Sequence, residues 1–410
     1  MRRSPSLLTL CILLSLLLAG LSPVAAQDDA AVWSIFLFDF EARGLIRVDL
    51  DGTVTEYDLG ISQDTFLNPQ AMAFAEGGQF AVFCYFGLAQ LPGEATLAVR
   101  NLDTGADWIT VDMGSVVDCS AGVIDDGGTQ VTVATINYFP DDPTTNSGDG
   151  GPVWELRVID VATGDIVATL DATSPAAIEA GMVTMYPILT DVRRFVDGVV
   201  TFVEAPYGTG GGALLNSYMW DIEAGTVTRT EGWGFPSATY LDATGELAWI
   251  DTDFELSAAE PASLMPAFNV VRVQAPGGEP QIVFHSANDN PVDVVFLDGG
   301  ARLAVLLQPG FEPEADPAAL LLDRWVTVDR GGTVSDLLDE FVFGELVDAP
   351  GGPVALETRF EAETITTTLT QYGVGEPRTI WQSERGGWDF VWVTPVVSDA
   401  PLGPFTPITP

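Results

Sequence analysis

Two kinds of glycine-containing turn alternate along the chain, and they constrain its fold more than any other feature. In the first kind a strand-like segment ends in a polar or acidic residue before Gly, as at 47–52, 100–105, 159–164, 220–225, 273–278, 328–332 and 371–375. The second kind lies between copies of the first, at 76–78, 125–128, 197–198, 242–245, 298–300 and 350–352. Short apolar and β-branched runs separate the turns, whereas helical periodicity is nearly absent. The alternation predicts repeated antiparallel units of four strands.

The two ends of this repeat explain why the second kind of turn is one copy short. Trp388 to Pro395 has the pattern of a first strand with no partner after it, and Trp33 to Phe40 that of a second strand with no partner before it. Pairing these two segments would complete a seventh unit and close a ring. We therefore expect an all-β, seven-bladed β-propeller with four antiparallel strands per blade.

The dipeptide Trp220-Asp221 stands at the end of a predicted third strand, where WD repeats carry the same pair. The turn 160–164 follows that pattern with Ile159 in place of Trp, while Trp388-Asp389 falls at the start of a strand. On these residues the chain resembles the WD-repeat-like and TolB-like propellers of exported bacterial proteins. The resemblance implies a scaffold that presents a binding surface, and it carries over no catalytic residue.

The N-terminal residues have the three parts of a secretory signal peptide. Arg2 and Arg3 precede an apolar run at 7–18, and small residues follow at 24–26. We expect a signal peptide at 1–26, a short segment at 27–32, the propeller at 33–395 and a Pro-rich tail at 396–410. This organisation predicts a secreted or extracytoplasmic protein. No later apolar run has the length that a transmembrane helix needs.

The charge of the chain narrows its chemistry. It has 58 Asp and Glu, 16 Arg, no Lys and one His, which gives a formal net charge of -42. Because the chain has no lysine, it cannot form a lysine Schiff base or bind a phosphate through a lysine. A single His is too few for a cluster of histidines around a metal ion. Nucleic acid and anionic membranes should be repelled. The composition favours a binding protein over an enzyme, with calcium as the one cofactor that its acids suggest.

Cys84 and Cys119 are the two cysteines outside the predicted signal peptide. In an exported protein such a pair can form one disulfide. The alternative is two small buried thiols, and the sequence leaves both open.

The predicted strand order places both kinds of turn on one face of the ring, which we call the turn face, and the longer connections on the other, the loop face. Aromatic residues end most second strands at the loop face, including Phe40, Phe86 and Phe360, and Tyr138, Phe139, Tyr207 and Phe254 are candidate ligand-binding residues. Asp289, near His285, is a further candidate. Asp141, Asp142 and Asp149 lie in one Gly-rich loop and are candidate calcium ligands. The alternatives are aromatics that fill the space between blades and acids that form a solvated rim.

These patterns favour a monomeric, non-enzymatic scaffold that binds a protein, peptide or glycan on its loop face. One rival is a glycan hydrolase or lyase that depends on carboxylates alone. Another is a calcium-dependent structural module of the cell surface.

Overall fold

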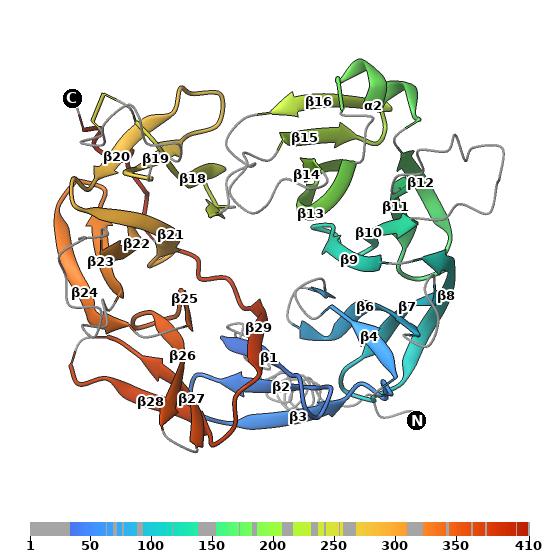
Figure 1. The fold of residues 1–410 in the computed structure, drawn as a ribbon, viewed down its shortest axis with the longest axis horizontal. Helices are drawn as coiled ribbons and strands as arrows, with labels where there is room; N and C mark the ends of the chain where they lie inside the picture. Colours follow the sequence, from blue (N-terminus) through green and yellow to red (C-terminus); the bar gives the residue numbers. More distant parts are fainter. Residues whose placement is uncertain are drawn as a thin grey trace, which may run out of the picture. The chain divides into compact units, whose positions relative to one another are not determined.

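The computed structural model confirms the propeller: one compact unit from Trp33 onward contains seven antiparallel sheets arranged in a ring (Figure 1). The structure describes residues 33–408 except 63, 69–71, 76–77, 88–92, 117, 138–152, 172, 183–186, 207–215, 231–236, 242, 254, 257–267, 310–322, 342–343, 362–363, 374 and 399. In this part of the chain, no helix has the length and apolar character required to cross a membrane.

Each sheet is one blade, numbered here along the chain and given from its inner strand outward. Blade 1 consists of β29 (Trp388–Val393), β1 (Ser34–Asp39), β2 (Gly44–Asp49) and β3 (Val54–Asp58). Blade 2 has a divided inner strand, β4 (Thr65–Leu67) and β5 (Ala73–Phe74), then β6 (Phe80–Gly87), β7 (Gly93–Asn101) and β8 (Asp107–Val116). Blade 3 consists of β9 (Asp118–Ile124), β10 (Gln130–Asn137), β11 (Val153–Asp160) and β12 (Ile166–Asp171).

The remaining blades have the same order. Blade 4 consists of β13 (Pro187–Val196), β14 (Val199–Pro206), β15 (Asn216–Asp221) and β16 (Thr226–Thr230), and the short helix α2 (Pro175–Glu179) precedes it. Blade 5 consists of β17 (Ala238–Leu241), β18 (Glu246–Asp251), β19 (Val270–Gln274) and β20 (Gln281–His285). Blade 6 consists of β21 (Asp289–Leu297), β22 (Arg302–Pro309), β23 (Asp323–Asp329) and β24 (Val334–Phe341). Blade 7 consists of β25 (Gly344–Val347), β26 (Val354–Glu361), β27 (Thr364–Gln371) and β28 (Arg378–Ser383).

The ring closes where the sequence predicts, because β29 pairs antiparallel with β1. Asp39 stands opposite Trp388 in this pairing. Beyond β29 the backbone N–H of Thr394 donates to the carbonyl oxygen of Ser34 at 3.0 Å, and the Thr394 hydroxyl accepts from the Ser34 N–H at 2.9 Å. Blade 1 is therefore built from both ends of the described chain.

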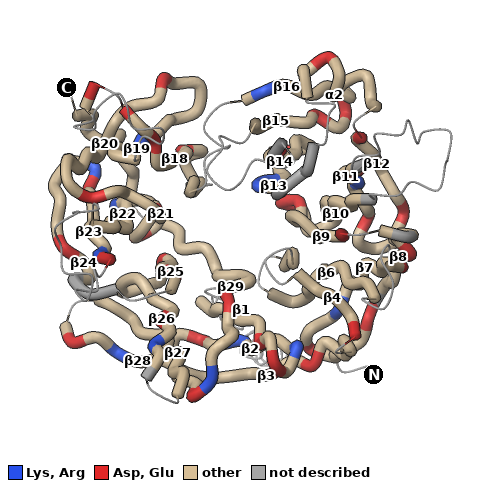
Figure 2. The backbone as a smooth tube through the Cα atoms, in the orientation of Figure 1, with Lys and Arg blue, Asp and Glu red and all other residues tan. Residues whose placement is uncertain are grey.

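Hairpin turns account for many of the acidic residues that Figure 2 shows around the ring. Asp160 is typical: one carboxylate oxygen accepts the backbone N–H groups of Ala162 and Thr163 at 3.0 and 2.8 Å. Hydrogen bonds from Thr163 lower the pKa of this carboxyl. Gly52 shows why such turns contain glycine, since its φ of 92° is one that other residues rarely adopt. These acids serve the backbone and imply no ligand.

Buried apolar side chains fill the spaces between neighbouring blades. Among the described residues, six separate clusters join blades 1 and 2, 2 and 3, 3 and 4, 5 and 6, 6 and 7, and 7 and 1. None of the six joins blades 4 and 5, where the Arg194 guanidinium instead lies 4.4 Å from the centre of the Tyr240 ring.

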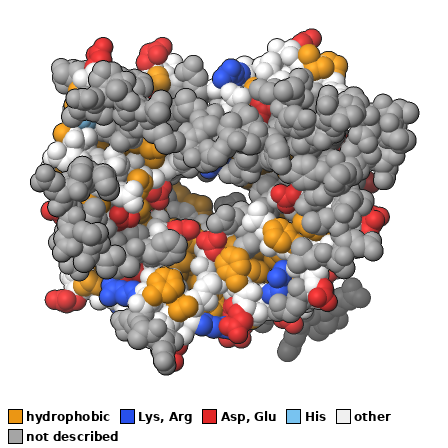
Figure 3. Space-filling view, in the orientation of Figure 1, with side chains coloured by type: hydrophobic (Ala, Val, Ile, Leu, Met, Phe, Trp, Pro, Cys, Tyr) orange, Lys and Arg blue, Asp and Glu red, His pale blue; other side chains and the backbone are white. Residues whose placement is uncertain are grey.

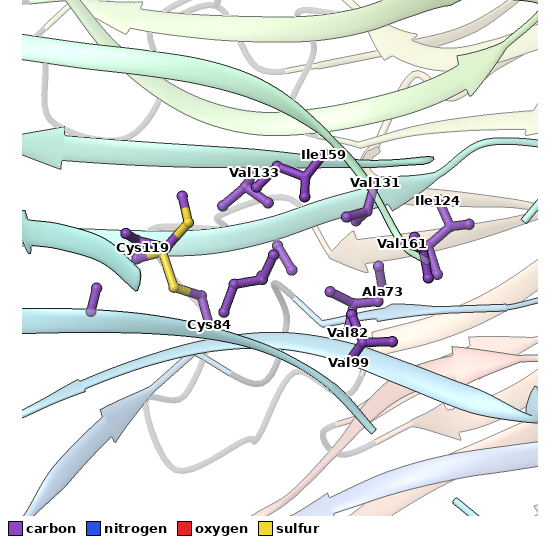
Figure 4. Close-up of a cluster of buried hydrophobic side chains, with 14 of the residues drawn as sticks. Ala73, Val82, Cys84, Val99, Cys119, Ile124, Val131, Val133, Ile159 and Val161 are labelled. Atoms are coloured by element: carbon purple, nitrogen blue, oxygen red, sulfur yellow. A yellow bond between two sulfur atoms is a disulfide. The ribbon is translucent and has the colours of Figure 1, made fainter. Parts of the chain in front are cut away.

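Blades 2 and 3 are also joined covalently. Cys84 on β6 and Cys119 on β9 form a disulfide inside their shared cluster, with Cα atoms 5.7 Å apart (Figure 4). Both residues are almost fully buried. The bond links the second strand of one blade to the inner strand of the next.

The Pro-rich tail packs against the propeller. Phe405 is 4% exposed and belongs to the cluster between blades 5 and 6. The Thr406 N–H donates to the Arg330 carbonyl oxygen at 2.8 Å, and the Ile408 N–H donates to that of Ile282 at 2.7 Å. Figure 1 accordingly shows the C-terminus near β20, although β29 lies in blade 1. The tail thus connects the closing blade to blades 5 and 6.

Candidate functional site

Most residues selected from the sequence as candidate ligands lie outside the described residues: Tyr138, Phe139, Asp141, Asp142, Asp149, Tyr207 and Phe254. Asp289 is described, and its carboxylate accepts from the Arg324 guanidinium at 2.9 Å within blade 6. The neighbouring histidine, His285, has its Nε2 3.2 Å from the Leu256 carbonyl oxygen.

The aromatic residues that end the second strands are not all alike. Phe86 is 4% exposed and fills the space between blades 2 and 3. Phe40 and Phe360 are 47% and 69% exposed, and they stand on blades 1 and 7. The exposed aromatics therefore flank the joint at which the ring closes.

Two adjoining cavities lie at this joint, with volumes of about 470 and 550 Å³, and both are lined by Arg385 and Trp388. We call them together the closure groove and define it by Asp39, Glu41, Tyr57, Phe360, Trp381, Arg385 and Trp388. Figure 3 shows hydrophobic, acidic and arginine side chains gathered where blades 1 and 7 meet. The volumes are those of ordinary ligand sites, which are concave and largely aromatic or apolar with a few fixed polar groups.

Asp39 is the fixed polar group at the base of the groove. It is the last residue of β1, is 3% exposed, and one of its oxygens accepts the N–H groups of Glu41 and Ala42, each at 2.9 Å. The turn that follows β1 therefore holds the carboxylate in one orientation. Its other oxygen accepts from the Arg385 guanidinium.

Arg385 lies on the short connection between β28 and β29. Its side chain is 45% exposed, its guanidinium lies 5.2 Å from the centre of the Trp388 ring, and a second guanidinium nitrogen is 3.6 Å from the Glu41 carboxylate. Gly387 follows with a φ of 83°, which lets the chain turn into β29. A cation thus lies between a buried carboxylate and an aromatic ring.

Further aromatic surface surrounds this contact. Trp381 on β28 meets Trp388 edge to face, with ring centres 5.0 Å apart. The indole Nε1 of Trp388 is buried without a hydrogen-bond partner in the described protein. Tyr57 on β3 also lines the first cavity, but its ring stacks on that of Phe36, with ring centres 5.8 Å apart, in the cluster between blades 1 and 2.

The groove is strongly acidic for its size. Its lining carries one Arg against five carboxylates, from Asp39, Glu41, Glu56, Asp58 and Glu384. Such a lining attracts cations and repels anions. Aromatic faces add to the attraction for a cation once it has partly lost its water.

A second group of carboxylates lies on inner strands around the centre of the ring, which Figure 3 shows as hollow. Glu345 on β25 hydrogen-bonds to Asp389 on β29, and Asp293 on β21 lies close enough to repel it. Burial is the largest cause that raises the pKa of Glu345 to about 8, and the charge of Asp389 adds to it. Burial likewise raises the pKa of Asp293, whose carboxylate accepts from the Val294 N–H at 2.8 Å.

Within the described residues, no group of three or more His, Cys, Asp or Glu could hold a metal ion.

Trp381, Arg385 and Trp388 were not among the candidate residues predicted from the sequence. One signal was available: pairing the orphan strand at Trp388 with the segment ending at Phe40 brings Trp388 next to Asp39. The charge of Asp39 and the aromatic ring of Trp388 would then have indicated a site at the closing joint.

Comparison with known proteins supports no family assignment. No family model matches the sequence, and no curated protein matches it. Among solved structures, the chain is similar to an acylaminoacyl peptidase from Pyrococcus horikoshii, with 12% identity and a TM-score of 0.48 over 86% of this chain and 48% of that one. It is similar to TolB from Acinetobacter baumannii, with 14% identity and a TM-score of 0.38 over 72% and 60% of the two chains. It is also similar to the β-propeller domain of the Trilobed protease from Pyrococcus furiosus, with 12% identity and a TM-score of 0.42 over 79% and 100%. The chain spans about half the length of the peptidase.

Proposed function

We propose that this protein is an exported, non-enzymatic binding scaffold, and that it holds a peptide or a segment of a protein in the closure groove. The observation that carries the proposal is the groove itself, which is open to water, has aromatic walls and contains one carboxylate fixed by backbone N–H groups. Export is part of the proposal on the strength of the signal-peptide pattern at 1–26.

The shape and position of the groove support a peptide ligand. Two adjoining cavities of about 470 and 550 Å³ can receive neighbouring side chains of one extended segment. Phe360 lines the second cavity and is 69% exposed, so it offers apolar surface at little conformational cost. Because the walls belong to well-paired strands of two blades, the groove is formed before the ligand arrives.

The chemistry of the groove favours binding over catalysis. Asp39 is already engaged by two backbone N–H groups and by Arg385, so it is not placed to act as a base or nucleophile.

The proposal can be tested by probing purified full-length protein against an array of extended peptides and an array of glycans. Phe360→Ser removes exposed apolar surface at the groove, whereas Ile178→Ser is the matched control, since Ile178 is 56% exposed on α2. We expect peptide binding that weakens about tenfold with the first change and not with the second, which corresponds to about 1.4 kcal/mol.

Two results would overturn the proposal. One is the absence of binding on the peptide array, and binding to glycans alone would then assign a different ligand class. The other is peptide binding that neither Phe360→Ser nor Trp381→Ala weakens, because the ligand would then occupy a different surface.

A further inference from the structure

The closure groove contains a site for a cation that is already built, and this inference rests on the proposed function. The Asp39 side chain is 5% exposed, and two backbone N–H groups hold its first oxygen. The second oxygen is directed to Arg385, whose guanidinium also lies over Trp388. A carboxylate with one oxygen fixed and an aromatic ring beside it is suited to a guanidinium or ammonium group.

The cation that now occupies this site is the less restrained partner. The Arg385 side chain is 45% exposed, whereas that of Asp39 is 5% exposed. Arg385 lies in a four-residue connection, and Gly386 and Gly387 follow it directly. Its other carboxylate neighbour, Glu41, is 3.6 Å away with a side chain that is 75% exposed. If the guanidinium left Asp39, it could therefore keep a carboxylate partner in water.

Arg385 lies where the two cavities of the groove adjoin. It lines both cavities, as does Trp388 beneath it. Movement of its side chain toward Glu41 would uncover the Asp39 carboxylate and the Trp388 ring.

We propose that the closure groove recognises a basic side chain of its peptide ligand, and that this side chain takes the place of Arg385 on Asp39 and Trp388. Arg385 acts as an internal competitor that keeps the buried carboxylate paired when no ligand is present. The exchange replaces one cation by another, so the carboxylate is never left unpaired in a site that water reaches poorly. The remaining carboxylates of the lining favour entry of a positive charge, and this attraction weakens with salt.

The test compares two blocked pentapeptides that differ only at their central residue, which is Arg in one and the neutral isostere citrulline in the other. Binding to the full-length protein is measured by calorimetry at low salt. We expect the Arg peptide to bind at least tenfold more tightly than the citrulline peptide.

Two variants separate the competitor from the site. Arg385→Gln should strengthen binding of the Arg peptide about tenfold, because the internal cation is gone. Asp39→Asn should weaken it at least tenfold. Arg302→Gln is the control, since Arg302 is also partly exposed and pairs with a single carboxylate, that of Asp298, away from the groove; it should change neither affinity.

The outcomes distinguish this inference from the proposed function. Equal binding of the two peptides, or weaker binding to Arg385→Gln, would overturn displacement, while the groove would remain the binding site if Phe360→Ser still weakened binding. Failure of every peptide of the array and of both pentapeptides to bind would overturn the proposed function itself. If Asp39→Asn fails to fold, the Arg385→Gln variant and the citrulline peptide still test whether a basic side chain displaces Arg385.

Discussion

Arg330 and Arg385 have the same kind of neighbours but lie in different surroundings. Arg330 forms two parallel hydrogen bonds to the Glu246 carboxylate, at 3.0 and 2.6 Å, and lies 4.4 Å from the centre of the Phe405 ring. Arg385 bonds to the Asp39 carboxylate and lies 5.2 Å from the centre of the Trp388 ring. The side chain of Arg330 is 12% exposed and that of Arg385 is 45% exposed.

The C-terminal tail accounts for this difference. It covers Arg330 with Phe405, and the Gly403 carbonyl oxygen accepts a further hydrogen bond from the guanidinium. Arg385 has two cavities around it in place of a covering segment. The same three groups, a carboxylate, a guanidinium and an aromatic ring, thus have two uses. Where the tail covers them, at Arg330, they hold two blades together. Where they are open to solvent, at Arg385, a ligand can reach them.

Substitution of Arg330 should have the largest effect on stability. Arg330→Gln would leave Glu246, whose side chain is 8% exposed, without its charge partner, and we expect a loss of about 3–5 kcal/mol in the free energy of unfolding. Urea denaturation measures this loss, and Arg302→Gln, an exposed pair, should lose less than about 1 kcal/mol. Equal losses in the two variants would show that covering the pair adds nothing.

Removal of the aromatic ring that covers Arg330 should have the next largest effect. Phe405→Ala deletes a side chain from the cluster between blades 5 and 6, and we expect a loss of about 2–4 kcal/mol by the same measurement. Phe360→Ala, at a 69% exposed position, should cost less than about 0.5 kcal/mol. An unchanged unfolding midpoint for Phe405→Ala would mean that the tail does not fasten these blades.

Substitution of Arg385 should change peptide binding but should have little effect on the free energy of unfolding. Arg385→Gln removes a largely exposed cation, and we expect a loss of about 1 kcal/mol or less in thermal or urea unfolding. A loss as large as that of Arg330→Gln would place Arg385 among the structural contacts and would contradict the comparison.

The pH dependence of stability should show the smallest effect. The pKa of Glu345 is raised from 4.5 to about 8 in the folded protein, so its carboxyl group prefers the protonated form there. Stability from this group is therefore complete below about pH 4.5 and is lost as the pH rises to about 8. Neighbouring protein atoms crowd the Glu345 carboxyl group, but the residue as a whole is exposed at the centre of the ring. Water therefore screens much of the interaction, and we expect the loss to be about 1 kcal/mol or less.

Urea denaturation between pH 5 and 9 measures this dependence. Glu345→Gln should flatten it and should make the variant more stable than the wild type at pH 9. Glu384→Gln, which removes an exposed carboxylate from the connection between β28 and β29, is the control and should keep the wild-type slope. A slope that Glu345→Gln leaves unchanged would assign the dependence to other carboxyl groups.

The sequence predicts the fold because the signals for the fold are local. Each hairpin turn carries its own Asp and Gly within a few residues, and the two orphan strands at the ends indicate how the ring closes. The disulfide could not be settled in this way, because Cys84 and Cys119 meet only when blades 2 and 3 stack.

The candidate site was harder to predict because its residues come together only on ring closure. Asp39 and Trp388 are far apart in the sequence and lie opposite each other in the closing blade. Phe86 and Phe360 end second strands in the same way, but a neighbouring blade covers the first and leaves the second exposed. The Pro-rich tail has no alternating pattern of apolar residues, so its sequence does not predict that Phe405 packs between blades 5 and 6.

The closing pair of strands also determines when the protein can finish folding during its synthesis. The strands β1 to β3 leave the ribosome early, but β29 follows roughly 330 residues later. At about 5–20 residues per second, the inner edge of β1 waits on the order of 15–70 s for its partner. An unpaired strand edge readily pairs with other chains over such a period. During synthesis this edge therefore needs protection. A chaperone could cover it, or the first blade could fold only after β29 has been made.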